Sequence, residues 1–226
     1  MKTVCLLLAA GSSSRMTNPG RHRRSERVTE DQTEINPGLT FGTDHASFPK
    51  MLLDFNGKTL LQHILDEVQQ LHNTSLLVVT GCYHDLLKEI LQAQQIPFIK
   101  NEQWEEGMGT SIQKGITHLM GHYSNADNVM VLVCDQPFIS SGLLQQMMDT
   151  KQTTGKGIIA CTYNNTTGTP VLFDKKYFNQ LAMLQGVTGA KKMIQQFMDD
   201  MVPVHFPEGA IDIDTPDDYN KLKGTP

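Results

Sequence analysis

The strongest constraint on the fold is the segment LLLAAGSSSRM at residues 6–16. The apolar run predicts a buried strand, and the small residues that follow it predict a tight turn into a helix. Backbone N–H groups in such a turn can approach a phosphate, at a helix N-terminus whose dipole favours negative charge. An ordinary core strand with a polar turn explains the same residues, so the segment indicates a phosphate site only if other residues support it.

The turn differs from the two commonest phosphate-binding loops. A Walker loop requires Gly-Lys-Ser/Thr at a fixed spacing, and a dinucleotide-binding loop requires three spaced glycines. Gly11 is the only glycine in this turn, and no Gly-Lys-Ser/Thr follows it at the Walker spacing. Arg15 instead offers a fork of charged donors that suits phosphate oxygens.

Composition narrows the class of protein. With 226 residues, we expect a single domain over residues 1–226 with a sizeable core. The net charge of −5 predicts no nucleic acid partner, because such partners attract strongly basic proteins. The first residues lack the form of a signal peptide, and no apolar run is long enough to span a bilayer. We therefore expect a cytoplasmic protein with no membrane partner.

Apolar runs that resemble strands alternate with segments of helical periodicity. We expect strands at 3–9, 76–80, 96–99, 128–134, 157–163, 170–173, 202–206 and 211–213, and helices at 58–71, 83–94, 109–120, 140–150, 175–184, 189–199 and 216–222. This alternation predicts an α/β fold with a mostly parallel sheet covered on both faces. Ligands of such sheets bind beyond the carboxyl ends of the strands, which places residues 9–16, 134–137 and 211–216 near one site.

Three charged positions could serve a phosphorylated ligand. Lys50 follows Pro49, which restricts the turn, and could place its ammonium on a phosphate. Asp135 ends an apolar strand, where a carboxylate is well placed to hold Mg2+. Asp212 and Asp214 alternate along an expected strand, so only one of them should face the site. Each of these residues also has a plain structural explanation, as a surface lysine or a helix-capping carboxylate.

Other segments predict contacts to a base, a ribose or a second substrate. The first set consists of Thr80, Gly81, Asn101, Gly107, Gly109 and Ser111, which lie at the end of a strand or before a helix. Residues 168–170 and 186–191 could line a pocket for an acceptor, or they could be plain turns. Trp104 is as well suited to packing as to stacking. The eight histidines form no close-spaced pair that suggests a zinc site.

A polar insertion at about 17–47 separates the first turn from Lys50. It contains an arginine cluster, Arg21, Arg23, Arg24 and Arg27. Loops of this length are usually functional or irregular. The insertion is therefore interpreted either as a surface segment or as a basic lid over a triphosphate.

Together, these motifs resemble the MobA-like nucleotidyltransferases over nearly the whole chain outside the insertion. The family's Leu-Ala-Ala-Gly-x-Ser-x-Arg-Met signature is matched by residues 8–16, and its Pro-Lys-x-Leu by residues 49–52. Residues 107–111, 135–137, 168–170 and 212–216 most resemble the molybdenum cofactor cytidylyltransferase branch.

The resemblance implies a Rossmann-like three-layer α/β/α fold of the nucleotide-diphospho-sugar transferase type, with a mixed, mostly parallel sheet. It also implies Mg2+-dependent transfer of a nucleotidyl group from an NTP, with CTP favoured, to a phosphorylated acceptor such as molybdopterin, releasing pyrophosphate. A molybdoenzyme partner protein is also implied.

The resemblance also assigns roles to residues. Leu8, Ala9, Ala10, Gly11, Ser12, Ser13 and Ser14 would hold the triphosphate, Arg15 and Lys50 would neutralise its charge, and Asp135 with Asp214 would hold Mg2+. Asp214 is preferred to Asp212 because it directly precedes the Thr-Pro pair, as the family's metal residue does.

Two departures from the family pattern leave alternatives open. Arg15 and Lys50 are 35 positions apart, whereas the family's link is usually short. The family's usual Gly-Asp-x-Gly-Ala occurs here as Gly186-Val187-Thr188-Gly189-Ala190, without the acidic residue. A sugar-phosphate or polyol-phosphate nucleotidyltransferase, or a non-catalytic nucleotide-binding chaperone for a molybdoenzyme, are therefore alternative interpretations.

Overall fold

The computed structural model of the chain describes residues 1–16, 48–187 and 189–223. The insertion expected at about 17–47, and the lid hypothesis attached to it, fall outside these described residues. Within them, none of the helices combines the length and the apolar character needed to cross a bilayer.

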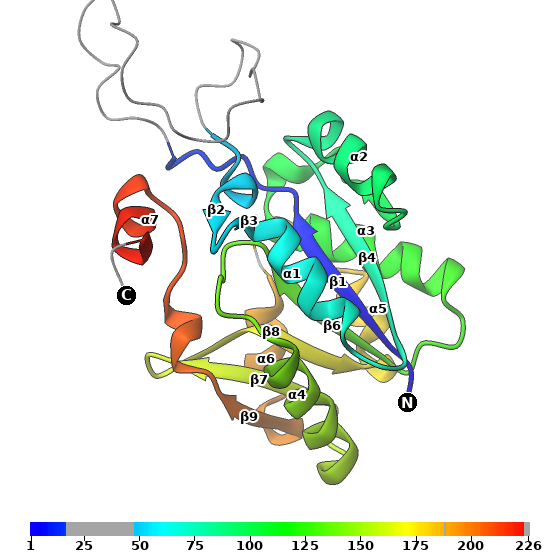
Figure 1. Cartoon of the computed structure of the whole chain (residues 1–226). Coiled ribbons are helices and arrows are strands. Elements are labelled where there is room, and N and C mark those ends of the chain that lie inside the picture. Colours follow the sequence, from blue (N-terminus) through cyan, green and yellow to red (C-terminus); the bar gives the residue numbers. More distant parts are fainter. Residues whose placement is uncertain (17–47, 188, 224–226) are drawn as a thin grey trace, which may run out of the picture.

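A mixed seven-stranded sheet forms the centre of the fold, with the strand order β5-β4-β1-β6-β8-β7-β9 (Figure 1). Its strands are β1 (Thr3–Ala9), β4 (Thr74–Thr80), β5 (Phe98–Lys100), β6 (Asn128–Val133), β7 (Ile158–Tyr163), β8 (Thr166–Asp174) and β9 (Met201–His205). All neighbouring pairs are parallel except those of β8, which runs antiparallel to both β6 and β7. The expected mixed, mostly parallel sheet is confirmed.

Helices cover both faces of the sheet. They are α1 (Leu60–Gln69), α2 (His84–Ala93), α3 (Met108–His122), α4 (Ser141–Thr154), α5 (Phe178–Leu181), α6 (Ala190–Gln196) and α7 (Pro216–Lys223). Ser140 caps α4 by accepting a hydrogen bond from the Leu143 backbone, and Thr59 caps α1 in the same way. The expected three-layer α/β/α architecture is confirmed.

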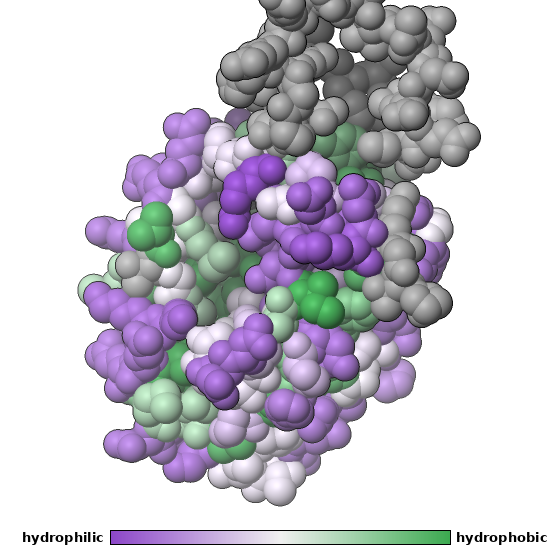
Figure 2. All heavy atoms as spheres, turned by 90° about the vertical axis from the view of Figure 1, so that its left-hand side faces the viewer, coloured by the Kyte–Doolittle hydropathy of each residue, from purple (hydrophilic) through white to green (hydrophobic). Residues whose placement is uncertain are grey.

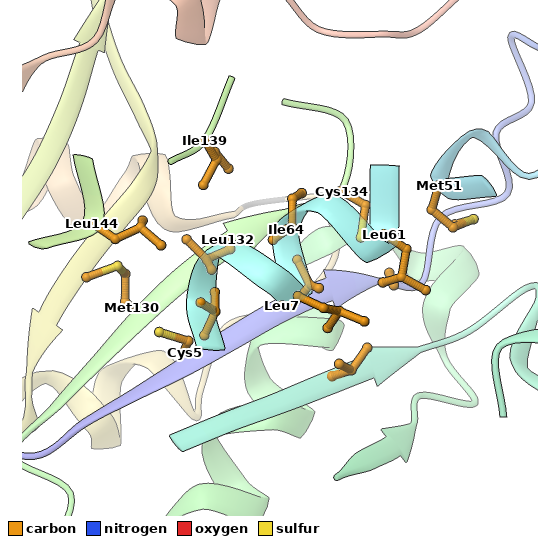
Figure 3. Packing of buried hydrophobic residues seen from close by; sticks show 14 of the residues in the cluster. Cys5, Leu7, Met51, Leu61, Ile64, Met130, Leu132, Cys134, Ile139 and Leu144 are labelled. Carbon is orange, nitrogen blue, oxygen red and sulfur yellow. The ribbon is translucent and has the colours of Figure 1, made fainter. Parts of the chain in front are cut away.

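Every residue of β1 is buried, because successive side chains point into different layers. Leu7 packs in one cluster with Ile64 of α1, and Figure 3 shows these two side chains among their neighbours. Leu6 packs in the other cluster with Ile112 of α3. Gly115 of α3 lies so close to β1 that a Cβ there would come within 2.5 Å of Leu6. Full burial of each leucine contributes roughly 1.5–3 kcal/mol.

The prediction of a strand at 211–213 is wrong. Residues Pro207–Ala210 form a short 3-10 turn, and the chain then crosses the carboxyl ends of the strands without pairing as one. Ile213 donates a backbone hydrogen bond to the Asp135 carbonyl, at 3.0 Å. Alternating polar and apolar residues predict a strand only where a neighbouring strand supplies a ladder of partners.

A small antiparallel hairpin between β2 (Asp54–Phe55) and β3 (Lys58–Thr59) was not predicted. Asn56 and Gly57 form its turn with φ values of 54° and 80°. Asn-Gly is the strongest short signal for such a turn, because both positions require a positive φ. The segment expected as one helix at 175–184 is also shorter, with a 3-10 turn leading into α5.

We expect Leu7→Ala to lower the free energy of unfolding by about 2–5 kcal/mol, because the smaller side chain leaves a cavity at the centre of the sheet. Denaturant unfolding followed by circular dichroism measures this loss. Met183→Ala is the matched control, since Met183 is 76% exposed and its truncation should change little. Equal effects of the two substitutions would contradict the central role of β1.

Candidate functional site

The candidate site lies where the strand order changes direction. From β1 the chain continues to β4 and β5 on one side, whereas β6 pairs with the other side of β1. Such a switch leaves a crevice beyond the carboxyl ends of the two central strands. The loop after β1 and Asp135 after β6 both occupy this position.

The loop at residues 10–16 is held by its neighbours. The Ala10 carbonyl accepts a hydrogen bond from the Cys82 backbone at 3.1 Å, and the Ser12 carbonyl accepts one from the Tyr83 hydroxyl at 2.7 Å. Gly81 permits the first contact, because a Cβ there would lie 2.5 Å from the Ala10 carbonyl oxygen. The helix that the sequence predicts after this turn falls outside the described residues.

Ser13 links the loop to Lys50. Its φ of 52° is in the left-handed region, and its hydroxyl accepts a hydrogen bond from the Lys50 backbone at 3.0 Å. The two segments that the insertion separates in sequence therefore meet directly.

Four charged side chains converge beside this loop. The Lys50 ammonium lies 2.6 Å from Asp135 Oδ2 and 3.0 Å from Asp214 Oδ1. Arg15 Nη1 lies 2.8 Å from Asp214 Oδ2. Lys50 is largely enclosed, whereas the Arg15 side chain is 69% exposed.

An apolar cluster positions these charges. It comprises Met16, Leu53, Leu60, Ile213 and Tyr219. Met16 is at the end of the loop, and Leu53 follows the Lys50 turn. Leu60 begins α1, Ile213 precedes α7, and Tyr219 belongs to α7. Met16 follows Arg15 and Ile213 precedes Asp214, so burying the two apolar side chains brings the two charged ones together.

The charges alter proton affinities within the site. Burial alone would lower the pKa of Lys50, but the charges and hydrogen bonds of Asp135 and Asp214 outweigh it and raise that pKa. Partial burial of the Asp212 carboxyl, and then the negative charges of Asp135 and Asp214, raise the pKa of Asp212 to about 6. Asp214 forms the ion pairs with Lys50 and Arg15, while Asp212 adds a neighbouring negative charge.

A cavity of about 350 Å3 opens beside the charge cluster. This size is typical of small-molecule sites. Figure 2, which faces this side of the molecule, shows a hollow with apolar residues at its base and hydrophilic residues along its edge. Of the sequence-predicted residues, it is lined by Leu8, Ala9, Ala10, Gly11, Ser12, Arg15, Lys50, Gly107, Ser111 and Asp135.

Several other sequence-predicted residues support this cavity without being among its lining residues. The Thr80 hydroxyl donates to the Ile99 carbonyl, and buried Asn101 donates from its amide to the hydroxyls of Thr110 and Ser111. The Gly109 backbone donates to the Gly186 carbonyl at 2.9 Å. The Thr80 contact holds the end of β5, and the other contacts hold the beginning of α3 in place.

Other residues that line the cavity were not predicted from the sequence as nucleotide contacts. Met51, Trp104, Glu105, Met108, Val133 and Cys134 complete its lining. The Gly-Met-Gly pattern placed Met108 near the site, but which side chains face the cavity depends on how α3 packs against β1.

The turn at Gly186 and Val187 lies against the same region. Gly107 has a φ of 117°, and a Cβ there would lie 2.7 Å from Val187 Cα. Residues 168–170 lie beside Tyr163, whose hydroxyl a Cβ on Gly168 would meet at 2.3 Å. The same hydroxyl accepts a hydrogen bond at 3.4 Å from the side-chain amide of Gln136, the residue after Asp135. Of the segment expected at 186–191 to line an acceptor pocket, Gly186 and Val187 therefore lie next to Gly107.

The carboxylates of Asp135 and Asp214 fit a divalent cation. Asp135 Oδ1 is buried and has no hydrogen-bond partner among the described residues, so an acceptor atom is left to serve a cation. Mg2+ usually takes one or two protein carboxylates together with water and phosphate oxygens. Over the described part of the chain, no group of three or more His, Cys, Asp or Glu residues is arranged to hold a metal ion.

The expectation that no two of the histidines form a close-spaced pair is wrong. His118 and His122 lie one turn apart on α3 and stack with ring centroids 4.0 Å apart, so a close-spaced pair does exist. Its rings are nearly parallel, with an interplanar angle of 11°.

Comparisons with known proteins agree with this geometry. The family model described as the MobA-like NTP transferase domain matches residues 5–201. The bifunctional protein GlmU of Francisella tularensis is 28% identical over 120 residues, covering 53% of this chain and 25% of the relative. The chain therefore aligns with about a quarter of the length of these curated relatives.

Solved structures share the fold. Rv0371c from Mycobacterium tuberculosis, in complex with manganese, has a TM-score of 0.70 at 20% identity, with 100% of both chains covered. Molybdopterin-guanine dinucleotide biosynthesis protein A from Archaeoglobus fulgidus has a TM-score of 0.57 at 15% identity, covering 97% of this chain and 96% of that one.

We expect Asp212→Asn to stabilise the metal-free protein at pH 8 and to change it little at pH 4. The folded-state pKa of about 6 lies above the usual value of 3.8, so the cost of ionising Asp212 is present above pH 6 and absent below about 4. Solvent screening limits the gain to about 1 kcal/mol or less.

Thermal unfolding in EDTA at both pH values measures this difference. Asp199→Asn is the control, because Asp199 is exposed. A gain for Asp212→Asn that is the same at pH 4 and pH 8 would show that the ionised carboxylate is not the cause.

Proposed function

Because the chain belongs to the MobA-like NTP transferase family and carries a nucleotidyltransferase domain, we propose that it transfers a nucleotidyl group from CTP to a phosphorylated acceptor, with molybdopterin as the leading candidate. The observation that carries this proposal is the meeting of Arg15, Lys50, Asp135 and Asp214 beside a cavity that begins at the loop after β1.

Binding of the triphosphate is assigned to the loop and its two cations. Leu8 to Ser12 line the cavity, so their backbone can approach phosphate oxygens. Lys50 and Arg15 line it as well and place two positive charges where the triphosphate would lie. Charge neutralisation and positioning account for most of the catalysis in transfers at phosphorus.

Asp135 and Asp214 are assigned to a divalent cation, with Mg2+ as the expected ion. When bound, such an ion neutralises charge on phosphate oxygens and helps to orient them. An acceptor phosphate oxygen would then form a bond to the α-phosphorus as the bond to pyrophosphate breaks. The manganese complex of the similar Rv0371c structure supports a divalent ion in this fold.

The acceptor is assigned to the segment around Gly186. Its contact with Gly107 places it next to the cavity. Val187 is 87% exposed, where the family pattern has an acidic residue. This difference favours testing sugar phosphates and polyol phosphates beside molybdopterin.

We expect Asp135→Asn to lower pyrophosphate release roughly a hundredfold or more, because a neutral amide replaces a carboxylate assigned to the metal. Asp149→Asn on the exposed face of α4 is the matched control and should keep full activity. The measurement is a coupled pyrophosphate assay with excess Mg2+. Full activity of Asp135→Asn would remove Asp135 from the proposed machinery.

A screen of CTP, GTP, ATP and UTP tests the base. We expect CTP with Mg2+ to raise the melting temperature most, since ligand binding to the folded state stabilises it. A larger shift with another nucleotide would replace CTP in the proposal.

Each nucleotide is then combined with molybdopterin, sugar phosphates and polyol phosphates, and pyrophosphate release is measured. We expect release with CTP and molybdopterin. Release with another acceptor would reassign the substrate, and nucleotide binding without product in any combination would favour the non-catalytic alternative.

A further inference from the structure

The Lys50 ammonium lies between the two carboxylates that are assigned to a divalent cation. It is within hydrogen-bonding distance of both Asp135 and Asp214, which lie 85 and 164 positions away in the chain. A bound Mg2+ ion is usually held by one or two such carboxylates together with phosphate oxygens. The Lys50 side chain is 16% exposed, so solvent screens this contact only in part.

The backbone of Lys50 is fixed, whereas its side chain is long and flexible. Met51 and Leu52 are buried, and the Lys50 backbone is hydrogen-bonded to the Ser13 hydroxyl and to the Leu53 backbone. The four-carbon side chain can therefore move its ammonium while the turn stays in place. Lys50 and Arg15 both line the cavity, so a triphosphate there would attract both away from Asp135 and Asp214.

A divalent ion and the Lys50 ammonium cannot share this position. Like charges a few ångströms apart repel strongly in a partly buried site. In the free protein, Lys50 relieves the repulsion between the two carboxylates, and a metal ion would have to displace it. A triphosphate removes this competition, because it offers the ammonium another set of anionic oxygens.

We propose that Lys50 holds the divalent-cation position between Asp135 and Asp214 in the free protein and yields it when a triphosphate enters the cavity. The cation then binds together with the nucleotide and not before it. This inference rests on the proposed nucleotidyl transfer site and concerns the order in which its components assemble.

The test measures Mn2+ binding to the full chain without nucleotide, from the loss of the free-ion signal in electron paramagnetic resonance. We expect Lys50→Met to bind Mn2+ roughly tenfold more tightly than the wild type, or better, because the competing charge is gone. Lys58→Met is the matched control and should bind as the wild type does, since Lys58 is exposed and pairs with Asp66. Lys50→Met binding no tighter than the wild type overturns the proposal.

A double variant locates the gained site. Adding Asp135→Asn to Lys50→Met should abolish the tighter binding, and its persistence would place the Mn2+ elsewhere and overturn the proposal. Lys50→Gln, which removes the charge and keeps a polar end, is the second variant if Lys50→Met does not fold. A thermal melt of each variant verifies its fold.

The outcome separates this inference from the proposed function. If Lys50→Met binds Mn2+ more tightly but the wild type releases no pyrophosphate with any nucleotide, the inference stands and the proposed function fails. If the wild type is active and Lys50→Met gains no binding, the inference alone fails.

Discussion

Burial of β1 on all sides is the constraint on which the rest of the structure depends. The strand hydrogen-bonds to β4 on one side and β6 on the other, and its side chains alternate into two separate hydrophobic clusters. No position along Thr3–Ala9 faces solvent, so a shift of one residue would place every side chain in the wrong layer. The loop at residues 10–16 therefore starts from a point that the whole core holds in place.

The charged residues beyond β1 depend on a second, smaller core. Met16, Leu53, Leu60, Ile213 and Tyr219 bring together segments that are far apart in the sequence. The Tyr219 hydroxyl also donates to the Asp54 carbonyl at 2.9 Å, which ties α7 to the hairpin after Lys50. Apolar burial thus supplies the free energy that holds two carboxylates close to each other, and Lys50 balances their charge.

The sequence predicted the parts of the site that depend on local signals. An apolar run followed by small residues marks β1 and its loop, and a carboxylate after a buried strand marks Asp135. It failed at 211–213, where alternation suggested a strand but no neighbouring strand was available. Thr80 and Asn101 have hydrogen bonds that support the end of β5 and the beginning of α3, and their contact with a nucleotide stays a prediction.

The sequence by itself determined the class of fold, the family and the identity of the charged residues, because periodicity and motifs are properties of neighbouring positions. Only the tertiary structure decided that Asp214, which the resemblance preferred to Asp212, forms ion pairs with Lys50 and Arg15, and that Trp104 and Met108 line the cavity. It also revealed that one ammonium bridges Asp135 and Asp214. These facts depend on the direction in which side chains point after distant segments have packed. Patterns of neighbouring residues do not determine that direction.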